Sequence, residues 1–289
     1  MVNRVELHGH RGCRGLCPEN TIEGFACALS IGVDALELDV GLTGDGVVAV
    51  THDPALNSDI TRDANGDWLT PPGALIRTLP YAALRVLDVG RIRPGTPYAA
   101  AFPEQTPCDG ARIPSLAEVL RLTPEVRLTV EIKTFARHPG WTATPAEMAE
   151  AVLLALDAAE ATGRVVVQSF DWRVLRYLRS ARAGLALAWL TSRASPGGSL
   201  PRAVAAEGGR TWAAEHEQLS AARIAEAHEL GLRVLAWTVN LPARMRQLLA
   251  WGVDGLITDR PDLARTVLAG TGLPLPPVRV VPSVLTTRP

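Results

Sequence analysis

Residues 8–53 hold the motifs that decide the fold: His8-Gly9-His10-Arg11-Gly12, Pro18-Glu19-Asn20-Thr21, Leu36-Glu37-Leu38-Asp39-Val40 and Thr51-His52-Asp53. The third motif places two acids one residue apart within an apolar run. In a β-strand, residues i and i+2 point to the same face, so Glu37 and Asp39 project together. Two carboxylates on one face repel each other unless a cation or a shared proton compensates. A divalent ion bound through oxygen is the simplest compensation, so the motif indicates a metal site.

The composition is that of a globular protein. Of 289 residues, 47% are hydrophobic and 20% are charged, which allows a sizeable core. The formal net charge of -1 gives no reason to expect nucleic acid or an anionic membrane as a partner. No segment approaches the ~20 uninterrupted apolar residues of a membrane span. With the first strand expected from about Val5, we expect no signal peptide. We therefore expect a cytoplasmic protein without stable membrane insertion, and the oligomeric state stays open.

The cysteines are Cys13, Cys17, Cys27 and Cys108. They show no regular pairing pattern, and a chain of this length does not need disulfides for stability. We expect reduced thiols. Cys13 and Cys17 lie near two histidines, but their spacing is loose and no second cysteine pair follows, so the pattern does not favour a zinc site.

Strand and helix patterns alternate along the chain. The expected strands are 4–10, 35–42, 127–133, 165–170, 185–190, 211–214, 232–239 and 255–258, with a further short strand at 47–51. The expected helices are 20–30, 115–122, 144–161, 171–181, 200–206, 220–230, 242–251 and 261–268. Asn20 and Glu23 fit the first helix as N-cap and capping-box partner. Eight such units in roughly 250 residues predict an α/β fold, a closed TIM (β/α)8 barrel. An open doubly wound sheet is expected to carry a G-x-G-x-x-G nucleotide-binding loop, and the sequence contains none.

Two segments depart from this alternation. Residues 53–113 are rich in Pro, Gly, Asp and Asn and contain one short helical pattern at 81–87, which indicates an insertion after the second strand region. Residues 271–289 are rich in proline and are expected to be irregular. We therefore expect a single catalytic barrel over residues 1–270, which includes the insertion, followed by a C-terminal tail.

In a barrel of this kind the active site lies at the C-terminal ends of the strands. The chemically capable residues expected there are His10, Arg11, Glu37, Asp39, His52, Glu131, Lys133 and Trp237. Glu37, Asp39 and Glu131 supply oxygen ligands for Mg2+ or Ca2+, which would polarise a phosphoryl group. Arg11 and Lys133, the only lysine of the chain, are suited to phosphate oxygens.

The two histidines complete this hypothesis. With an ordinary pKa near ~6.5, histidine exchanges protons at neutral pH. One of His10 and His52 would take a proton from the attacking hydroxyl, and the other would give one to the leaving alcohol. Other interpretations exist: Glu131 and Lys133 could simply pair with each other. His8 could line the pocket or serve the structure, and Trp237 could belong to the core.

The ordered motifs resemble the glycerophosphodiester phosphodiesterase family. The resemblance spans about His8 to Asp262 and rests on the motifs His10-Arg11-Gly12, Pro18-Glu19-Asn20-Thr21, Glu37-x-Asp39, His52-Asp53, Arg112-Ile113-Pro114-Ser115-Leu116, Glu131-x-Lys133, Trp237-Thr238-Val239-Asn240 and Gly255-Leu256-Ile257-Thr258-Asp259-Arg260-Pro261. It implies a TIM barrel with an insertion after the second histidine. It also implies metal-dependent hydrolysis of glycerophosphodiesters to sn-glycerol 3-phosphate and an alcohol.

The resemblance implies the same roles for individual residues. His10 and His52 match the acid/base pair, and Glu37, Asp39 and Glu131 match the metal ligands. Arg11 and Lys133 match phosphate contacts, and Trp237 matches a wall of the substrate pocket. Residues 56–62 depart from the family pattern, which leaves the alcohol open. Two other functions remain: a lysophospholipase D, which needs an apolar channel in the insertion, and a non-catalytic barrel that binds phosphorylated ligands.

Overall fold

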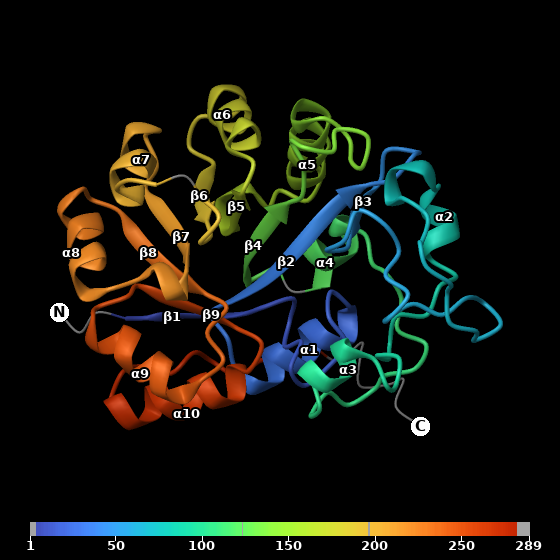
Figure 1. The fold of residues 1–289 in the computed structure, drawn as a ribbon, viewed down its shortest axis with the longest axis horizontal. Coiled ribbons are helices and arrows are strands. Elements are labelled where there is room, and N and C mark those ends of the chain that lie inside the picture. Colours follow the sequence, from blue (N-terminus) through green and yellow to red (C-terminus); the bar gives the residue numbers. More distant parts are fainter. Residues whose placement is uncertain (1–3, 123, 196, 282–289) are drawn as a thin grey trace.

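Eight parallel strands close into a barrel in the computed structural model, which describes residues 4–281 apart from 123 and 196 (Figure 1). They are β1 (Glu6–Gly9), β2 (Ala35–Leu42), β4 (Arg127–Ile132), β5 (Val165–Ser169), β6 (Ala186–Thr191), β7 (Thr211–Glu215), β8 (Arg233–Trp237) and β9 (Gly255–Thr258). Their order is β1-β9-β8-β7-β6-β5-β4-β2, and β1 pairs with β2 to close the circle. The short strand β3 (Val48–Val50) runs antiparallel beside β2. The predicted TIM barrel is confirmed.

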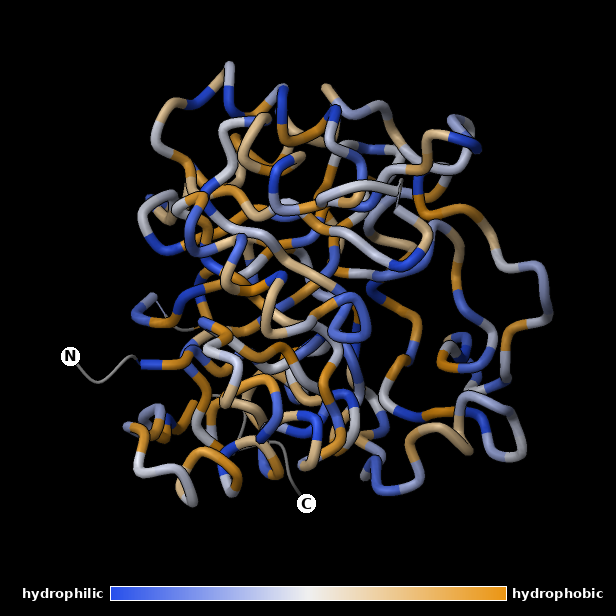
Figure 2. Tube along the Cα trace, turned by 60° about the vertical axis from the view of Figure 1, so that its left-hand side comes forward, coloured by the Kyte–Doolittle hydropathy of each residue, from blue (hydrophilic) through white to orange (hydrophobic). Residues whose placement is uncertain are grey.

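Helices surround the barrel. They are α1 (Ile22–Ile31), α4 (Leu116–Leu122), α5 (Pro145–Ala158), α6 (Trp172–Ala181), α7 (Leu200–Ala206), α8 (Ala221–Glu229), α9 (Pro242–Ala250) and α10 (Pro261–Thr271). Short 3-10 turns at Thr162–Arg164 and His216–Gln218 join some of them to strands. Hydrophobic and hydrophilic residues alternate over short distances along the trace, as amphipathic helices packed on a buried sheet require (Figure 2).

The start of α1 differs from the prediction. Thr21, and not Asn20, is the N-cap: its hydroxyl accepts a hydrogen bond from the backbone N–H of Gly24 at 3.0 Å. Asn20 has a φ of 55°, in the left-handed region, and its side chain turns toward the barrel interior. Both residue types cap helices well, so the choice between these neighbours depends on tertiary contacts that no local pattern reveals.

The insertion has its own small core. Ile76, Leu84 and Val89 pack with Ala49 of β3 and with Ile113, which fixes the insertion to the barrel. It contains the 3-10 turn Ile76–Thr78 and two short helices, α2 (Tyr81–Leu84) and α3 (Pro97–Ala101). The prediction of one helical segment was therefore incomplete.

The overlooked helix α3 had a sequence signal. Thr96 caps it, and Pro97 occupies its first position. At the other end of the chain, residues 273–281 follow α10 without helix or strand, and the rest of the expected tail, 282–289, lies outside the described residues.

The barrel interior has an apolar half and a polar half. Strands β6 to β9 fill their side with an apolar cluster that includes Ala188, Leu190, Ala213, Leu235 and Ile257. Strands β1, β2 and β4 instead turn histidines and acids inward. The chemistry of the barrel is therefore concentrated on one side.

His8 lies below the reactive end of the barrel. Its ring contacts Thr129 at 3.1 Å and Glu6 at 3.2 Å, and Glu6 also pairs with Arg127 and Arg233. Of the two roles considered for His8, the contacts match the structural one.

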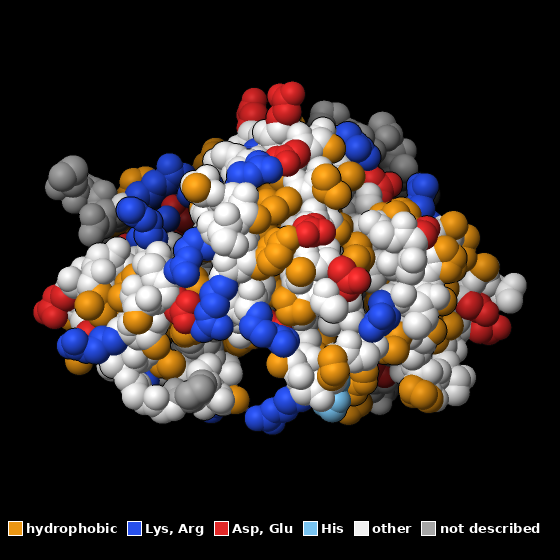
Figure 3. All heavy atoms as spheres, turned by 90° about the horizontal axis from the view of Figure 1, so that it is seen from above, with side chains coloured by type: hydrophobic (Ala, Val, Ile, Leu, Met, Phe, Trp, Pro, Cys, Tyr) orange, Lys and Arg blue, Asp and Glu red, His pale blue; other side chains and the backbone are white. Residues whose placement is uncertain are grey.

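The surface shows no large field of one charge on the face drawn in Figure 3. Basic and acidic side chains are interspersed there with apolar ones, in keeping with the net charge of -1. Among the described residues, no helix has the length and apolar character needed to cross a membrane.

Candidate active site

A cavity of about 200 Å3 opens at the C-terminal ends of the barrel strands. Its lining includes seven of the eight predicted site residues: His10, Arg11, Glu37, His52, Glu131, Lys133 and Trp237. The eighth, Asp39, is buried and lies 3.0 Å from the Lys133 ammonium. The structure thus brings the whole predicted set together, from strands far apart in sequence.

Three carboxylates form the centre of the site. Glu37, Asp39 and Glu131 each offer an oxygen within 4.8 Å of the others, and all three side chains are buried. The arrangement follows from strand pairing, since Asp39 of β2 lies beside Glu131 of β4 in the parallel register. Buried carboxylates at this spacing require positive charge or protons.

Lys133 supplies part of that charge. Its Nζ lies 2.6 Å from Glu131 Oε1 and 3.0 Å from Asp39 Oδ1. Apart from this ammonium, neither oxygen has a hydrogen-bond partner among the described residues, although both are buried. Oxygens in this state are suited to a cation, and the donor set, all carboxylate oxygen, is the one that hard divalent ions prefer. The residues present therefore fit a Mg2+ or Ca2+ ion.

The protonation of the three acids is uneven. Burial, reinforced by the charges of Asp39 and Glu131, raises the pKa of Glu37 well above its ordinary value. Burial also acts to raise the pKa of Asp39, but Lys133 and Arg11 outweigh it and hold that pKa well below its usual range. Burial raises the pKa of Glu131, with Lys133 opposing. The cations therefore favour the charged form of Asp39, whereas burial favours the neutral forms of Glu37 and Glu131.

Arg11 is held tightly between acids. Its Nη1 donates to Glu19 at 2.7 Å, and its Nε lies 3.1 Å from Asp39 Oδ2. Its backbone adopts a φ of 49°, uncommon for a residue with a side chain, and its N–H donates to Glu37 at 3.0 Å. Gly12 follows with a φ of 88°, where a Cβ would lie 2.8 Å from the backbone of Gly24. The His-Arg-Gly motif is therefore a tight turn that aims Arg11 at the carboxylates.

Each predicted catalytic histidine is bonded to an aspartate through Nδ1. His10 Nδ1 lies 2.6 Å from Asp259, and His52 Nδ1 lies 2.7 Å from Asp53. Because a carboxylate accepts the Nδ1 proton, the network assigns Nε2 as the nitrogen with a lone pair in the neutral ring. Nε2 of His10 lies 3.8 Å from Glu37. Burial lowers the pKa of His10 to about 4, although Asp259 opposes this, so the ring is neutral at pH 7.

Sequence reasoning missed several supporting residues. The sequence motif 255–261 contains Asp259 but does not indicate a role for it, although Asp259 directly follows β9, the position in a barrel strand where functional residues gather. Asn20 was assigned to helix entry, but its amide donates to Asp39 at 3.1 Å. Gln168, late in β5, donates to Glu37 at 3.0 Å. Arg14 lines the cavity and lies 3.0 Å from Asp259.

The opposite wall of the cavity is apolar. Phe170 and Trp237 meet edge to face with ring centroids 5.4 Å apart, and Leu190 and Ile257 lie beside them. The indole N–H of Trp237 donates to the backbone of Ala213 at 3.2 Å, which fixes the ring. One side of the cavity can therefore bind charge and the other a carbon skeleton.

Comparisons with known proteins agree with this geometry. Residues 10–263 match the model of the glycerophosphoryl diester phosphodiesterase family. The chain is 30% identical over 271 residues to a glycerophosphodiester phosphodiesterase of Bacillus altitudinis, covering 90% of this chain and 96% of that one. It is 29% identical over 282 residues to one from Bacillus subtilis, covering 93% and 88% of the two chains.

Solved structures show the same likeness. A structure from Silicibacter pomeroyi, provisionally assigned as a glycerophosphoryl diester phosphodiesterase, has a TM-score of 0.89 at 39% identity and covers 94% of this chain and 96% of that one. An Oleispira antarctica phosphodiesterase in complex with the product sn-glycerol-3-phosphate has a TM-score of 0.74 at 21% identity, with coverage of 92% and 97%. The chain belongs to the glycerophosphodiester phosphodiesterase family.

Proposed function

We propose that this enzyme hydrolyses glycerophosphodiesters to sn-glycerol 3-phosphate and an alcohol, with a divalent metal ion and the pair His10 and His52. The observation that carries the proposal is a single cavity that joins three buried carboxylates to two histidines, each of which is bonded to an aspartate. The Oleispira antarctica relative holds sn-glycerol 3-phosphate as product, which supports the same product here.

Glu37, Asp39 and Glu131 would hold the ion, Mg2+ or Ca2+. When bound, it supplies a Lewis acid that polarises the phosphoryl group and offsets its charge. Arg11 and Lys133 contribute fixed positive charge beside the phosphoryl oxygens. Both are already paired with carboxylates in the structure. Their first effect is therefore to position Asp39 and Glu131.

His10 and His52 move the protons. Neutral His10 accepts through Nε2 the proton of the attacking hydroxyl, from water or from the glycerol 2-hydroxyl; in the second case, water then opens the cyclic phosphate to give sn-glycerol 3-phosphate. The oxygen then forms a bond to phosphorus while the bond from phosphorus to the alcohol oxygen breaks. His52, in its imidazolium form, gives its Nε2 proton to that leaving oxygen, and solvent then takes the proton from His10 and returns one to His52. Asp259 and Asp53 each accept the Nδ1 proton and thereby direct Nε2 of the two rings toward the reacting atoms.

The substrate is a glycerophosphodiester and not a lysophospholipid. A lysophospholipase D needs an apolar channel for an acyl chain, and the apolar side chains that the insertion could offer for it are Leu69, Leu75, Ile76, Leu79 and Tyr81. Three of these, Ile76, Leu79 and Tyr81, pack the insertion against the barrel instead. This packing favours the smaller substrate.

The test compares release of the head group from sn-glycero-3-phosphocholine and from lysophosphatidylcholine, with Mg2+ or Ca2+ and with excess chelator. We expect turnover of the first substrate, loss of it in chelator, and recovery when the ion is restored. Full activity in chelator would contradict the role of the ion. A preference for lysophosphatidylcholine would contradict the substrate class, and binding without turnover would indicate a non-catalytic barrel.

A further inference from the structure

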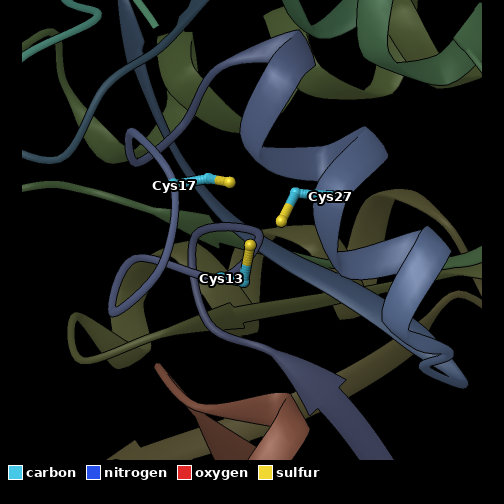
Figure 4. A group of neighbouring side chains, drawn as sticks. All are labelled: Cys13, Cys17 and Cys27. Atoms are coloured by element: carbon cyan, nitrogen blue, oxygen red, sulfur yellow. The ribbon is translucent and has the colours of Figure 1, made fainter. Parts of the chain in front are cut away.

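Three of the four cysteines meet outside the active-site cavity. Cys13 and Cys17 lie in the loop between β1 and α1, and Cys27 lies within α1. Their sulfurs lie within 4.8 Å of one another. The three side chains point toward a common centre (Figure 4). The sequence spacing did not indicate this group, because the turn of the loop is what brings Cys27 to the other two.

The group is largely enclosed. Cys13 is fully buried, and Cys17 and Cys27 are partly buried against the same hydrophobic core. The Cys13 thiol hydrogen-bonds with both neighbouring thiols and donates to the carbonyl of Gly24 at 3.4 Å. A single buried cysteine behaves as a small hydrophobic residue. Three cysteines whose sulfurs point toward one centre can also act together as ligands of a metal ion.

The electrostatics argue against a reactive thiol. Hydrogen bonds with Cys17 and Cys27, together with burial, raise the pKa of Cys13 well above its ordinary value. The hydrogen bond with Cys13 acts to lower the pKa of Cys17, but Cys27 and burial outweigh it and raise that pKa to about 12. Protonated thiols are poor nucleophiles and oxidise slowly. A soft metal ion, in contrast, displaces thiol protons.

We propose that Cys13, Cys17 and Cys27 form a trithiolate site for a soft metal ion of the Zn2+ class, separate from the carboxylate site. Sulfurs that surround a tetrahedral Zn2+ at ~2.3 Å lie roughly 3.8 Å apart, so the triad needs only small movements to close on the ion. Three metal–sulfur bonds form, three thiol protons pass to solvent, and water fills the fourth position.

The ion would fix the loop that serves the active site. That loop begins with Arg11 and ends with Glu19 and Asn20, and both Arg11 and Asn20 contact Asp39. Cys13 and Cys17 lie within it, whereas Cys27 belongs to α1. A bond from each to one ion ties the loop to the helix. The expected role is therefore structural, with greater resistance to unfolding when the ion is bound.

The experiment titrates the reduced full-length protein with Cd2+, which gives an ultraviolet sulfur-to-metal charge-transfer band with thiolates but not with carboxylates. We expect one equivalent to bind with this band, Zn2+ to displace it, and the affinity to rise with pH. Bound Zn2+ in hundredfold excess over its Kd should raise the Tm by on the order of 5 °C. Cys27→Ser should weaken Cd2+ binding at least tenfold and lose this rise in Tm.

Two variants act as controls. Cys108→Ser alters the one cysteine outside the triad, and Glu131→Gln alters the carboxylate site, so both should keep the band. Folded wild-type protein without the band would overturn the proposal and leave the triad as packing. A band that persists in Cys27→Ser, or that is lost in Cys108→Ser, would also overturn it. Activity of the proposed phosphodiesterase plays no part in this readout, so failure of one proposal is distinguishable from failure of the other.

Discussion

Asp259 holds His10 through a hydrogen bond of 2.6 Å that joins residues 249 positions apart in the sequence. The same carboxylate accepts from the amide of Asn240 at 2.6 Å and lies 3.0 Å from Nε of Arg14. These contacts fix the carboxylate, and the carboxylate in turn fixes the ring, with Nε2 directed at the acidic cluster. Asp259 is therefore a positioning residue.

Asp259→Asn should lower kcat by roughly 10- to 100-fold, because the amide no longer enforces the reactive tautomer of His10. KM should change little, and the pH profile of kcat should shift. Asn240→Ala, which leaves the carboxylate on His10, is the control and should have a smaller effect. Steady-state kinetics across pH test this prediction. An equal loss of kcat in both variants would mean that Asp259 only stabilises the local fold.

Stability should depend on pH through His10. Its pKa is about 4 in the folded protein and 6.5 without the fold, so between these values the unfolded chain binds more protons. Stability therefore rises with pH in this window, is fully present above about 6.5, and is lost as the pH falls toward 4. The shift corresponds to on the order of 3 kcal/mol. In urea unfolding, the free energy of unfolding of His10→Asn should lack this part of the pH dependence. The same pH dependence in the variant and in wild type would contradict the shift.

Lys133→Met should destabilise the metal-free protein by roughly 3–5 kcal/mol, because it leaves buried Glu131 without its cation and buried Asp39 with Arg11 alone. Mg2+ or Ca2+ should recover more stability in this variant than in wild type. Arg182→Met removes a solvent-exposed partner of Asp157 and should cost less than about 1 kcal/mol. Thermal unfolding with and without the ions measures both effects, and equal ion responses would argue against binding at these carboxylates.

The two neighbours at the start of α1 should have separable roles. Thr21→Ala removes the N-cap and should cost about 1 kcal/mol of stability. Asn20→Ala removes the amide that donates to Asp39, so it should lower activity more than Thr21→Ala does. Chemical denaturation and kinetics on both variants test this, and the reverse pattern would restore Asn20 as the cap.

The barrel was predictable because its signals are local. Strand β2 matches its predicted range because an apolar run between a helix stop and a Gly-containing turn marks both ends. The acidic pair followed from the period of a strand, and Glu131 and Lys133 followed from the next one. These inferences need only periodicity and the rule that barrel sites lie at the C-terminal ends of strands.

The missed features depend on contacts between distant segments. The role of Asp259 exists only once β9 lies beside β1. Cys27 joins Cys13 and Cys17 only because the loop folds back on α1. Thr21, and not Asn20, caps α1 because the Asn20 side chain donates a hydrogen bond to Asp39 in the barrel. Sequence periodicity and secondary-structure propensity do not reveal such contacts between distant segments.

The central claim is tested most directly by release of sn-glycerol 3-phosphate from sn-glycero-3-phosphocholine in the presence of Mg2+ or Ca2+, for wild type and for His10→Ala. The account predicts turnover by wild type and its loss in the folded variant. Absence of turnover by metal-loaded wild type would contradict the proposed reaction, and turnover that survives His10→Ala would contradict the assignment of His10 to proton transfer.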